Sequence, residues 1–113
     1  MPRWATPDAA IRDYWRRRGG HVQSLDLSAP WTSALYDRQE AELAYACVAW
    51  ALAQIPETER QIVVAVALGA SYRSIAEYLH RSDWWVRNRH VRGWTVVRDI
   101  LAELDLIPAN RSA

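Results

Sequence analysis

The segment from Ser71 to Trp94, SYRSIAEYLHRSDWWVRNRHVRGW, constrains the fold of this 113-residue chain more than any other. In its first part, Ile75, Ala76 and Leu79 fall on one face of a short amphipathic helix. The three residues that follow, HRS, break this period, and a helical pattern then resumes. The segment therefore predicts two helices joined by a three-residue turn.

Two serines mark the starts of these predicted helices. Ser71 and Ser82 can each accept a hydrogen bond from a backbone N–H of the first turn that follows. The second helix begins at Asp83 and places Val86 inward. Its solvent-facing positions are Arg87, Asn88, Arg89 and Arg92. Arginine and asparagine read the edges of guanine and adenine, so the pattern is typical of a helix-turn-helix whose second helix enters the DNA major groove.

The N-terminal region predicts one helix and one loop. Thr6 followed by Pro7 is a favourable helix start, because proline fits the first helical position. This helix should run to about Arg18, where Gly19-Gly20 ends it. Residues 19–32 contain turn-forming residues without a sustained period and predict a loop.

A second helix should begin near Thr32 or Asp37 and run to Ile55. Its apolar positions cover a broad face, which predicts burial for Leu43, Ala46, Cys47, Trp50, Leu52 and Ala53.

A third helix follows Pro56, and residues 58–61 (TERQ) fit a capping box at its start. The run QIVVAVALGA has β-branched residues, but no other strand-like segment exists to pair with it, so a helix over 58–68 is favoured. The last helix should run from Asp83 to about Asp105. Its apolar stripe consists of Val86, His90, Trp94, Val97, Leu101 and Leu104. We expect Trp50 and Trp94 in the core.

These segments predict an all-α fold, a helical bundle with a C-terminal helix-turn-helix and a long recognition helix. We expect an N-terminal basic helix and loop over 1–31. A helical DNA-binding domain should span 32–107, with the helix-turn-helix at 71–94, and a tail should span 108–113. No apolar run approaches the roughly 18 residues of a membrane span, and the start lacks the pattern of a secretory signal. We therefore expect a soluble cytoplasmic protein, without a membrane partner.

Charge is unevenly distributed along the chain although its net value is only +1. All basic residues other than histidine are arginines. Residues 71–98 contain six arginines against Glu77 and Asp83, and residues 1–18 contain five arginines against two aspartates. Such concentration of positive charge is what a polyanion-binding surface needs.

The span from Leu52 to about Leu104 resembles region four, the C-terminal DNA-binding region of bacterial sigma factors. The residues that carry the resemblance are Ile55, Pro56, Arg60, Ser71, Tyr72, Arg73, Ile75, Ala76, Leu79, Ser82, Val86, Arg87, Arg89 and Arg92. Region four also resembles the DNA-binding ends of small phage regulators of late transcription. These resemblances imply a bacterial host cytoplasm or nucleoid as the location.

The resemblance implies a set of DNA contacts. The implied base-contacting residues are Asp83, Trp84, Arg87 and Asn88. The implied phosphate-contacting residues are Ser71, Tyr72, Arg73, Ser82, Arg89 and Arg92.

The chain departs from the family pattern in the turn and directly after it. His80 stands where glycine is usual, at a position that often requires a positive φ. Arg81 replaces an apolar turn residue. Trp84 and Trp85 occupy positions that usually hold small or polar residues. Indoles at these positions could touch thymine methyl groups or form a protein-binding patch. We expect at least one of the two to pack inward.

The leading hypothesis is a DNA-binding transcription regulator whose partner is double-stranded DNA. One such module has a small interface, so we also expect a homodimer or a complex with RNA polymerase. A second hypothesis is an RNA polymerase-binding phage antiterminator or inhibitor that uses the same fold as a scaffold. A third is a phage DNA-packaging recognition subunit.

We expect no enzyme activity and no cofactor, because neither a phosphate-binding loop nor a nucleophile with a base partner is present. The three histidines and Cys47 have no metal-ligand spacing, so no metal site is expected. Arg16, Arg17 and Arg18 form a second candidate basic site. An equally good interpretation is a favourable set of cations at a helix C-terminus.

Overall fold

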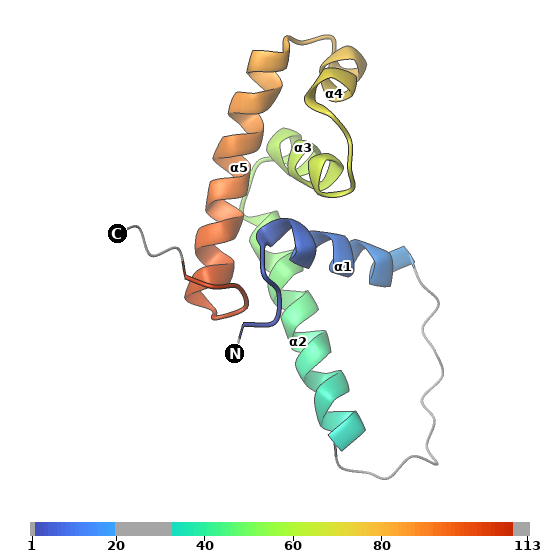
Figure 1. The fold of residues 1–113 in the computed structure, drawn as a ribbon, viewed down its shortest axis with the longest axis vertical. Coiled ribbons are helices and arrows are strands. Elements are labelled where there is room, and N and C mark those ends of the chain that lie inside the picture. The colour runs from blue at the N-terminus through green and yellow to red at the C-terminus, as the bar shows by residue number, and fades with distance from the viewer. Residues whose placement is uncertain (1, 20–32, 110–113) are drawn as a thin grey trace.

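The computed structural model describes residues 2–19 and 33–109, which form five α-helices and no strand (Figure 1). The helices are α1 (Pro7–Gly19), α2 (Ser33–Ala53), α3 (Glu57–Ala67), α4 (Tyr72–Leu79) and α5 (Asp83–Glu103). The predicted all-α bundle is confirmed for these residues. The loop expected over 20–32 and the final residues 110–113 of the expected tail lie outside the described residues.

Helix α5 runs along most of the long axis of the molecule, and the other helices pack beside it (Figure 1). Helix α3 contacts the other four helices and joins two hydrophobic cores. The larger core is formed by α1, α2, α3 and the second half of α5. The smaller core lies between α3, α4 and the first half of α5. The first half of α5 is therefore supported by a core of its own.

The helix α1 packs on the bundle, through contacts with α2, α3 and α5. Thr6 starts it as expected, since its Oγ1 accepts a hydrogen bond from the backbone N–H of Ala9 (3.1 Å). Two side chains of different elements, Trp4 through Nε1 (3.0 Å) and Tyr45 through its hydroxyl (3.1 Å), donate to Asp13 Oδ2. These contacts fix α1 against α2 and the N-terminal segment.

The capping box expected at 58–61 is wrong. Helix α3 begins one residue earlier, at Glu57, and Pro56 is its N-cap without a side-chain cap bond. Arg60 stabilises this corner instead. Its Nε and NH2 groups donate to the carbonyl oxygens of Leu52 (2.9 Å), in the last turn of α2, and of Ile55 (3.1 Å), directly after that helix. Arg60 therefore satisfies carbonyl groups that a helix end leaves unpaired.

The burial expected for one face of α2 is largely wrong. Leu43 is 67% exposed and Trp50 is 56% exposed, so Trp50 is not a core residue. Ala46 and Ala53 are exposed as well, and Cys47 is half-buried. The buried residues of α2 are Ala44, Val48, Ala51 and Leu52. Because α2 is apolar around its circumference from Leu43 to Ala53, its sequence there does not indicate which side faces the core.

Helix α5 matches its predicted start and most of its predicted stripe. Val86, Val97 and Leu101 are fully buried, Trp94 is half-buried against the larger core, and Leu104 is 46% exposed, contrary to expectation. The helix ends at Glu103, two residues before the predicted end.

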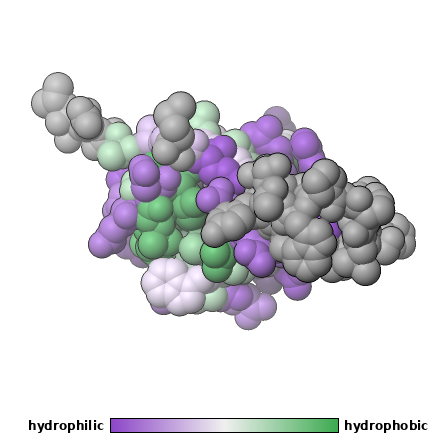
Figure 2. Space-filling view, turned by 90° about the horizontal axis from the view of Figure 1, so that it is seen from below, coloured by the Kyte–Doolittle hydropathy of each residue, from purple (hydrophilic) through white to green (hydrophobic). Residues whose placement is uncertain are grey.

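Seen from the lower end of the molecule, hydrophobic residues gather between hydrophilic ones (Figure 2).

The crossing of α3 and α5 requires a glycine. A Cβ atom added at Gly93 would lie 2.9 Å from Val63 Cγ2, 3.1 Å from Glu59 Cβ and 3.2 Å from Ile55 Cδ1. These distances are shorter than ordinary van der Waals contacts, so the two helices approach as closely as they do because position 93 has no side chain.

Candidate nucleic-acid interface

Both helices of the 71–94 segment start at the predicted serines. Ser71 Oγ accepts a hydrogen bond from the backbone N–H of Ser74, and Ser82 Oγ accepts one from that of Trp85, each at 3.1 Å. Both serines have extended backbone angles, as N-cap residues do. Local side-chain chemistry therefore sets where α4 and α5 begin.

The connection between α4 and α5 turns at His80, which has φ 55° and ψ 45°. This left-handed conformation agrees with the positive φ that was expected at position 80. The backbone N–H of Arg81 donates to the carbonyl of Ala76 (3.0 Å), and that of His80 to the carbonyl of Glu77 (3.4 Å). The bonds close the C-terminal end of α4, and histidine adopts this conformation at a steric cost that glycine would avoid.

The smaller core holds α4 against α5. Its buried residues are Ile62, Ile75, Ala76 and Val86. Ala76 is 3% exposed, and its small side chain leaves room for the two helices to pack closely. Trp85 packs against the same core, as expected for one of the two adjacent indoles.

The first half of α5 presents five exposed residues on one face, at spacings of three and four. We call this set the α5 stripe: Trp84, Arg87, Asn88, Val91 and Arg92. Trp84 is 71% exposed and Val91 is 51% exposed. Three of the four predicted base-contacting residues lie on the stripe. The fourth, Asp83, is exposed at the first position of the helix.

Tyr72 supports the α5 stripe from α4. The guanidinium carbon of Arg87 lies 5.5 Å from the centre of the Tyr72 ring, within the range of a cation–π interaction. The Tyr72 hydroxyl forms a 2.8 Å hydrogen bond with His90 Nδ1. Tyr72 is half-buried, so its hydroxyl bonds within the protein rather than at the surface where a phosphate contact was predicted.

His90 lies in the interior, as expected. It is 9% exposed, and its Nε2 has no hydrogen-bond partner among the described groups. Burial lowers the pKa of His90 below its usual 6.5, and the negative charge of Asp8 on α1 opposes this shift. The neutral imidazole is therefore favoured under the α5 stripe.

The structure corrects the prediction for Arg89. Its NH1 group donates to Glu59 Oε1 at 2.9 Å, and the Glu59 side chain is only 8% exposed. The Arg89 guanidinium also lies 5.1 Å from the ring centre of Trp85. A buried carboxylate requires this cation, so Arg89 joins α5 to α3 and we remove it from the predicted phosphate contacts.

The other predicted phosphate contacts are at the surface. Arg92 is exposed on the α5 stripe. Arg73 and Glu77 form an exposed pair one helical turn apart, with a 3.7 Å separation between Nε and Oε1, and such a pair contributes little. The Ser71 and Ser82 hydroxyl oxygens act as caps.

Sequence reasoning missed two residues of this region. Arg81 is exposed beside the turn, with its guanidinium 4.9 Å from the Trp85 ring centre, and it adds positive charge next to the α5 stripe. Glu59 lies on the buried side of α3 beside Ile62 and Val63. An acidic residue on an apolar helix face was the available signal, because such a carboxylate needs a cationic partner.

The second candidate basic site lies apart from the α5 stripe, in the last turn of α1 (Figure 1). Arg17 forms an ion pair with Glu42 and lies over the Tyr45 ring (5.2 Å). Arg18 lies over the Trp15 ring (5.3 Å), and Arg16 is exposed. At least one of the three arginines is therefore committed to an internal contact.

Within residues 2–19 and 33–109, no three histidine, cysteine, aspartate or glutamate side chains are grouped so that they could hold a metal ion. None of the described helices is long and apolar enough to span a bilayer. Comparison with known proteins finds no matching family model, curated protein or solved structure.

Proposed function

We propose that the chain is a DNA-binding transcription regulator whose α4–α5 segment works as a sigma region-four-like helix-turn-helix. In this proposal the α5 stripe enters the major groove of duplex DNA. The observation that carries it is the stripe itself, where two arginines and an asparagine lie exposed at helical spacing on a helix fixed from behind by the smaller core.

Each residue of the α5 stripe then has a role set by its chemistry. Arg87 suits the two acceptors of a guanine edge, and Asn88 suits the donor and acceptor of an adenine edge, each contact contributing roughly 1–3 kcal/mol of discrimination. Arg92 and Arg73 supply attraction to phosphates that does not depend on sequence. Arg81 lies beside them and adds to the same attraction.

The direct test is the double substitution Arg87→Ala with Asn88→Ala. Preferred duplexes are first selected from a random pool with the unmodified protein, and binding is then measured by fluorescence anisotropy. We expect the variant to lose roughly one to four orders of magnitude of affinity for selected duplexes, since two contacts are removed. Its affinity for random duplexes should fall much less.

Arg98→Ala is the matched control. Arg98 lies further along α5, where it forms a hydrogen-bonded ion pair with Asp99 at 2.9 Å. Its loss should leave selectivity unchanged. Full affinity and selectivity of the double variant, with its helical content intact, would contradict the assigned base contacts.

A second candidate function is favoured by the exposed indole of Trp84. An exposed tryptophan on the same helix face as the exposed Val91 is a suitable anchor for a protein partner, and RNA polymerase is the partner expected for a phage antiterminator or inhibitor. Trp84→Ala separates the two functions. Loss of binding to purified RNA polymerase with retained selection of DNA supports the second function, whereas absence of any polymerase binding by the unmodified protein eliminates it.

A further inference from the structure

Helix α2 presents a second exposed stripe, which has a different composition from the α5 stripe. Its members are Leu43, Ala46, Trp50 and Ala53, and we call them the α2 stripe. Leu43 is 67% exposed and Trp50 is 56% exposed. From residue 43 to residue 56 the chain has no charged residue. The stripe therefore exposes large apolar side chains on a part of α2 that has no charged residue of its own.

The spacing of the α2 stripe is that of a helix-pairing seam. Its residues follow one another at intervals of three, four and three, which is the alternation of the a and d positions of a heptad. An isolated seam of this kind leaves its knobs without holes. Opposite faces of α2 are apolar, yet only the face with Ala44, Val48, Ala51 and Leu52 is covered by the larger core.

We propose that the α2 stripe binds a second copy of this chain, with the two α2 helices antiparallel. The size pattern of the stripe complements itself about a two-fold axis level with Val48. In that register Leu43 faces Ala53 of the second copy, and Trp50 faces Ala46 of the second copy. Each large side chain thus meets a small one, as a two-fold symmetric interface requires.

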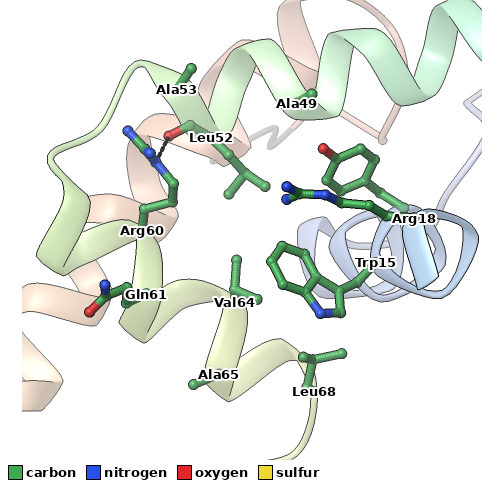
Figure 3. A pocket seen from close by; sticks show the side chains of 11 residues that line it. Trp15, Arg18, Ala49, Leu52, Ala53, Arg60, Gln61, Val64, Ala65 and Leu68 are labelled. Carbon is green, nitrogen blue, oxygen red and sulfur yellow. Dashed lines mark hydrogen bonds between the residues drawn. The ribbon is translucent and has the colours of Figure 1, made fainter.

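A cavity beside the α2 stripe enlarges the surface available to the second copy. It has a volume of about 440 Å³, lies between α1, α2 and α3, and is mostly apolar (Figure 3). Ala49 and Ala53 line it from α2, Trp15 lines it from α1, and Leu68 lines it directly after the end of α3. Arg18 and Arg60 also line the cavity. Since Leu43 of the second copy faces Ala53, it lies at the mouth of this cavity and can fill part of it.

The same register places Cys47, which is the only cysteine of the chain, beside the symmetry axis. Cys47 is half-buried at the edge of the α2 stripe and one residue from the level of Val48. In an antiparallel helix pair, equivalent positions on this edge face each other. Two copies of Cys47 should therefore lie near enough to be joined by a short thiol crosslinker. This prediction depends on the register as well as on the existence of the dimer.

The interface is about three helical turns long and falls in the low size class, below roughly 1,200 Å². We therefore expect a concentration-dependent dimer, with a dissociation constant in the micromolar range or weaker. The proposal goes beyond the DNA-binding function and does not depend on it. A dimer would give two copies of the α5 stripe, but a monomer could still bind a single DNA site.

The test is sedimentation equilibrium of the full chain over micromolar to millimolar concentrations, with Trp50→Glu and Trp84→Glu. The unmodified protein and Trp84→Glu should both approach twice the 13.0 kDa chain mass. Trp50→Glu should stay monomeric, because antiparallel pairing would bury its charge against Ala46 of the second copy. Circular dichroism checks that both variants remain folded. We expect that they do, because Trp50 and Trp84 are both exposed.

Crosslinking gives a second readout. A short bis-maleimide should join two unmodified chains through Cys47, with loss of the product in Cys47→Ser and in Trp50→Glu but not in Trp84→Glu. A protein that stays monomeric at millimolar concentration overturns the proposal. Dimers that form equally well with Trp50→Glu, or that never crosslink, overturn the α2 interface. Any of these results leaves selective DNA binding through Arg87 and Asn88 to be tested separately.

Discussion

The α5 stripe and the α2 stripe each expose a tryptophan on a helix surface, but their surroundings differ. Trp84 is flanked by Arg87 and Asn88, while Trp50 is flanked by alanines within an uncharged run. The same indole can therefore accompany contacts to a polyanion in one place and pack against apolar groups in the other. The role of an exposed aromatic side chain therefore depends on the charge and size of its helical neighbours.

The two stripes also differ in how they are held. The α5 stripe lies on a helix that is tied to α3 by the Arg89–Glu59 pair and capped by Ser82. The α2 stripe belongs to a helix whose opposite face is packed in the larger core. Changes to the α3–α5 contact should therefore affect DNA binding more than association through α2.

The largest expected effect is that of Arg89→Ala. This change leaves the Glu59 carboxylate buried without its cation and should lower the free energy of unfolding by about 3 kcal/mol. Glu59→Gln combined with Arg89→Ala should recover part of the loss, because no buried charge then remains. Urea denaturation measures both variants. An Arg89→Ala protein of unchanged stability would show that the pair does not support the α5 stripe.

Gly93→Ala should have the next largest effect. The added methyl group must displace Val63 and Glu59 where α3 crosses α5, at a cost of about 1–3 kcal/mol. The higher helix propensity of alanine offsets roughly 1 kcal/mol of this. We expect a net decrease in unfolding free energy and weaker DNA binding, with little change in dimerisation. Increased stability would mean that the crossing is looser than the distances indicate.

Ser82→Ala should cost about 1 kcal/mol, because the N–H of Trp85 loses its cap. The variant should also bind selected duplexes less tightly, since the start of α5 carries the stripe. Ser74→Ala is the control. The Ser74 hydroxyl donates to the Ser71 carbonyl on an exposed face, and its loss should change stability by less than about 0.5 kcal/mol.

The smallest effect concerns pH. The folded-state pKa of His90 lies below 6.5, so the unfolded chain binds the additional proton as the pH falls below that value. The contribution of neutral His90 to the free energy of unfolding is fully present above pH 6.5 and is lost as the pH falls through the folded-state pKa. Urea titrations at several pH values should show that the free energy of unfolding decreases less between pH 6.5 and lower pH in His90→Gln than in the unmodified protein. His80→Gln, at an exposed position, should retain the full decrease.

The caps, the turn and the apolar side of α4 could be predicted from the sequence because each depends on neighbours within a few residues. Ser71 and Ser82 are examples. The positive φ of His80 was expected only from the resemblance to region four, in which glycine usually stands at this position. The buried side of α2 could not be predicted, since the helix is apolar on all sides from Leu43 to Ala53 and only the tertiary packing selects a face. The capping box failed because α3 begins at Glu57, with Pro56 as its N-cap, so Thr58 already lies inside the helix.

The candidate site was predictable in part. Helical spacing places Arg87, Asn88 and Arg92 on one exposed face, and the structure agrees. The position of Arg89 depends on Glu59, thirty residues earlier, and no local pattern links the two. The contact of Arg87 with the Tyr72 ring likewise requires the relative placement of α4 and α5.

The salt dependence of DNA affinity reports whether the arginines of the α5 stripe contact phosphates. In a plot of the logarithm of the binding constant against the logarithm of salt concentration, Arg92→Ala should reduce the slope by about 1. Arg98→Ala, whose guanidinium is paired with Asp99 further along the same helix, should leave the slope unchanged. Equal slopes for the unmodified protein and Arg92→Ala, or a reduced slope for Arg98→Ala alone, would contradict DNA binding through the α5 stripe.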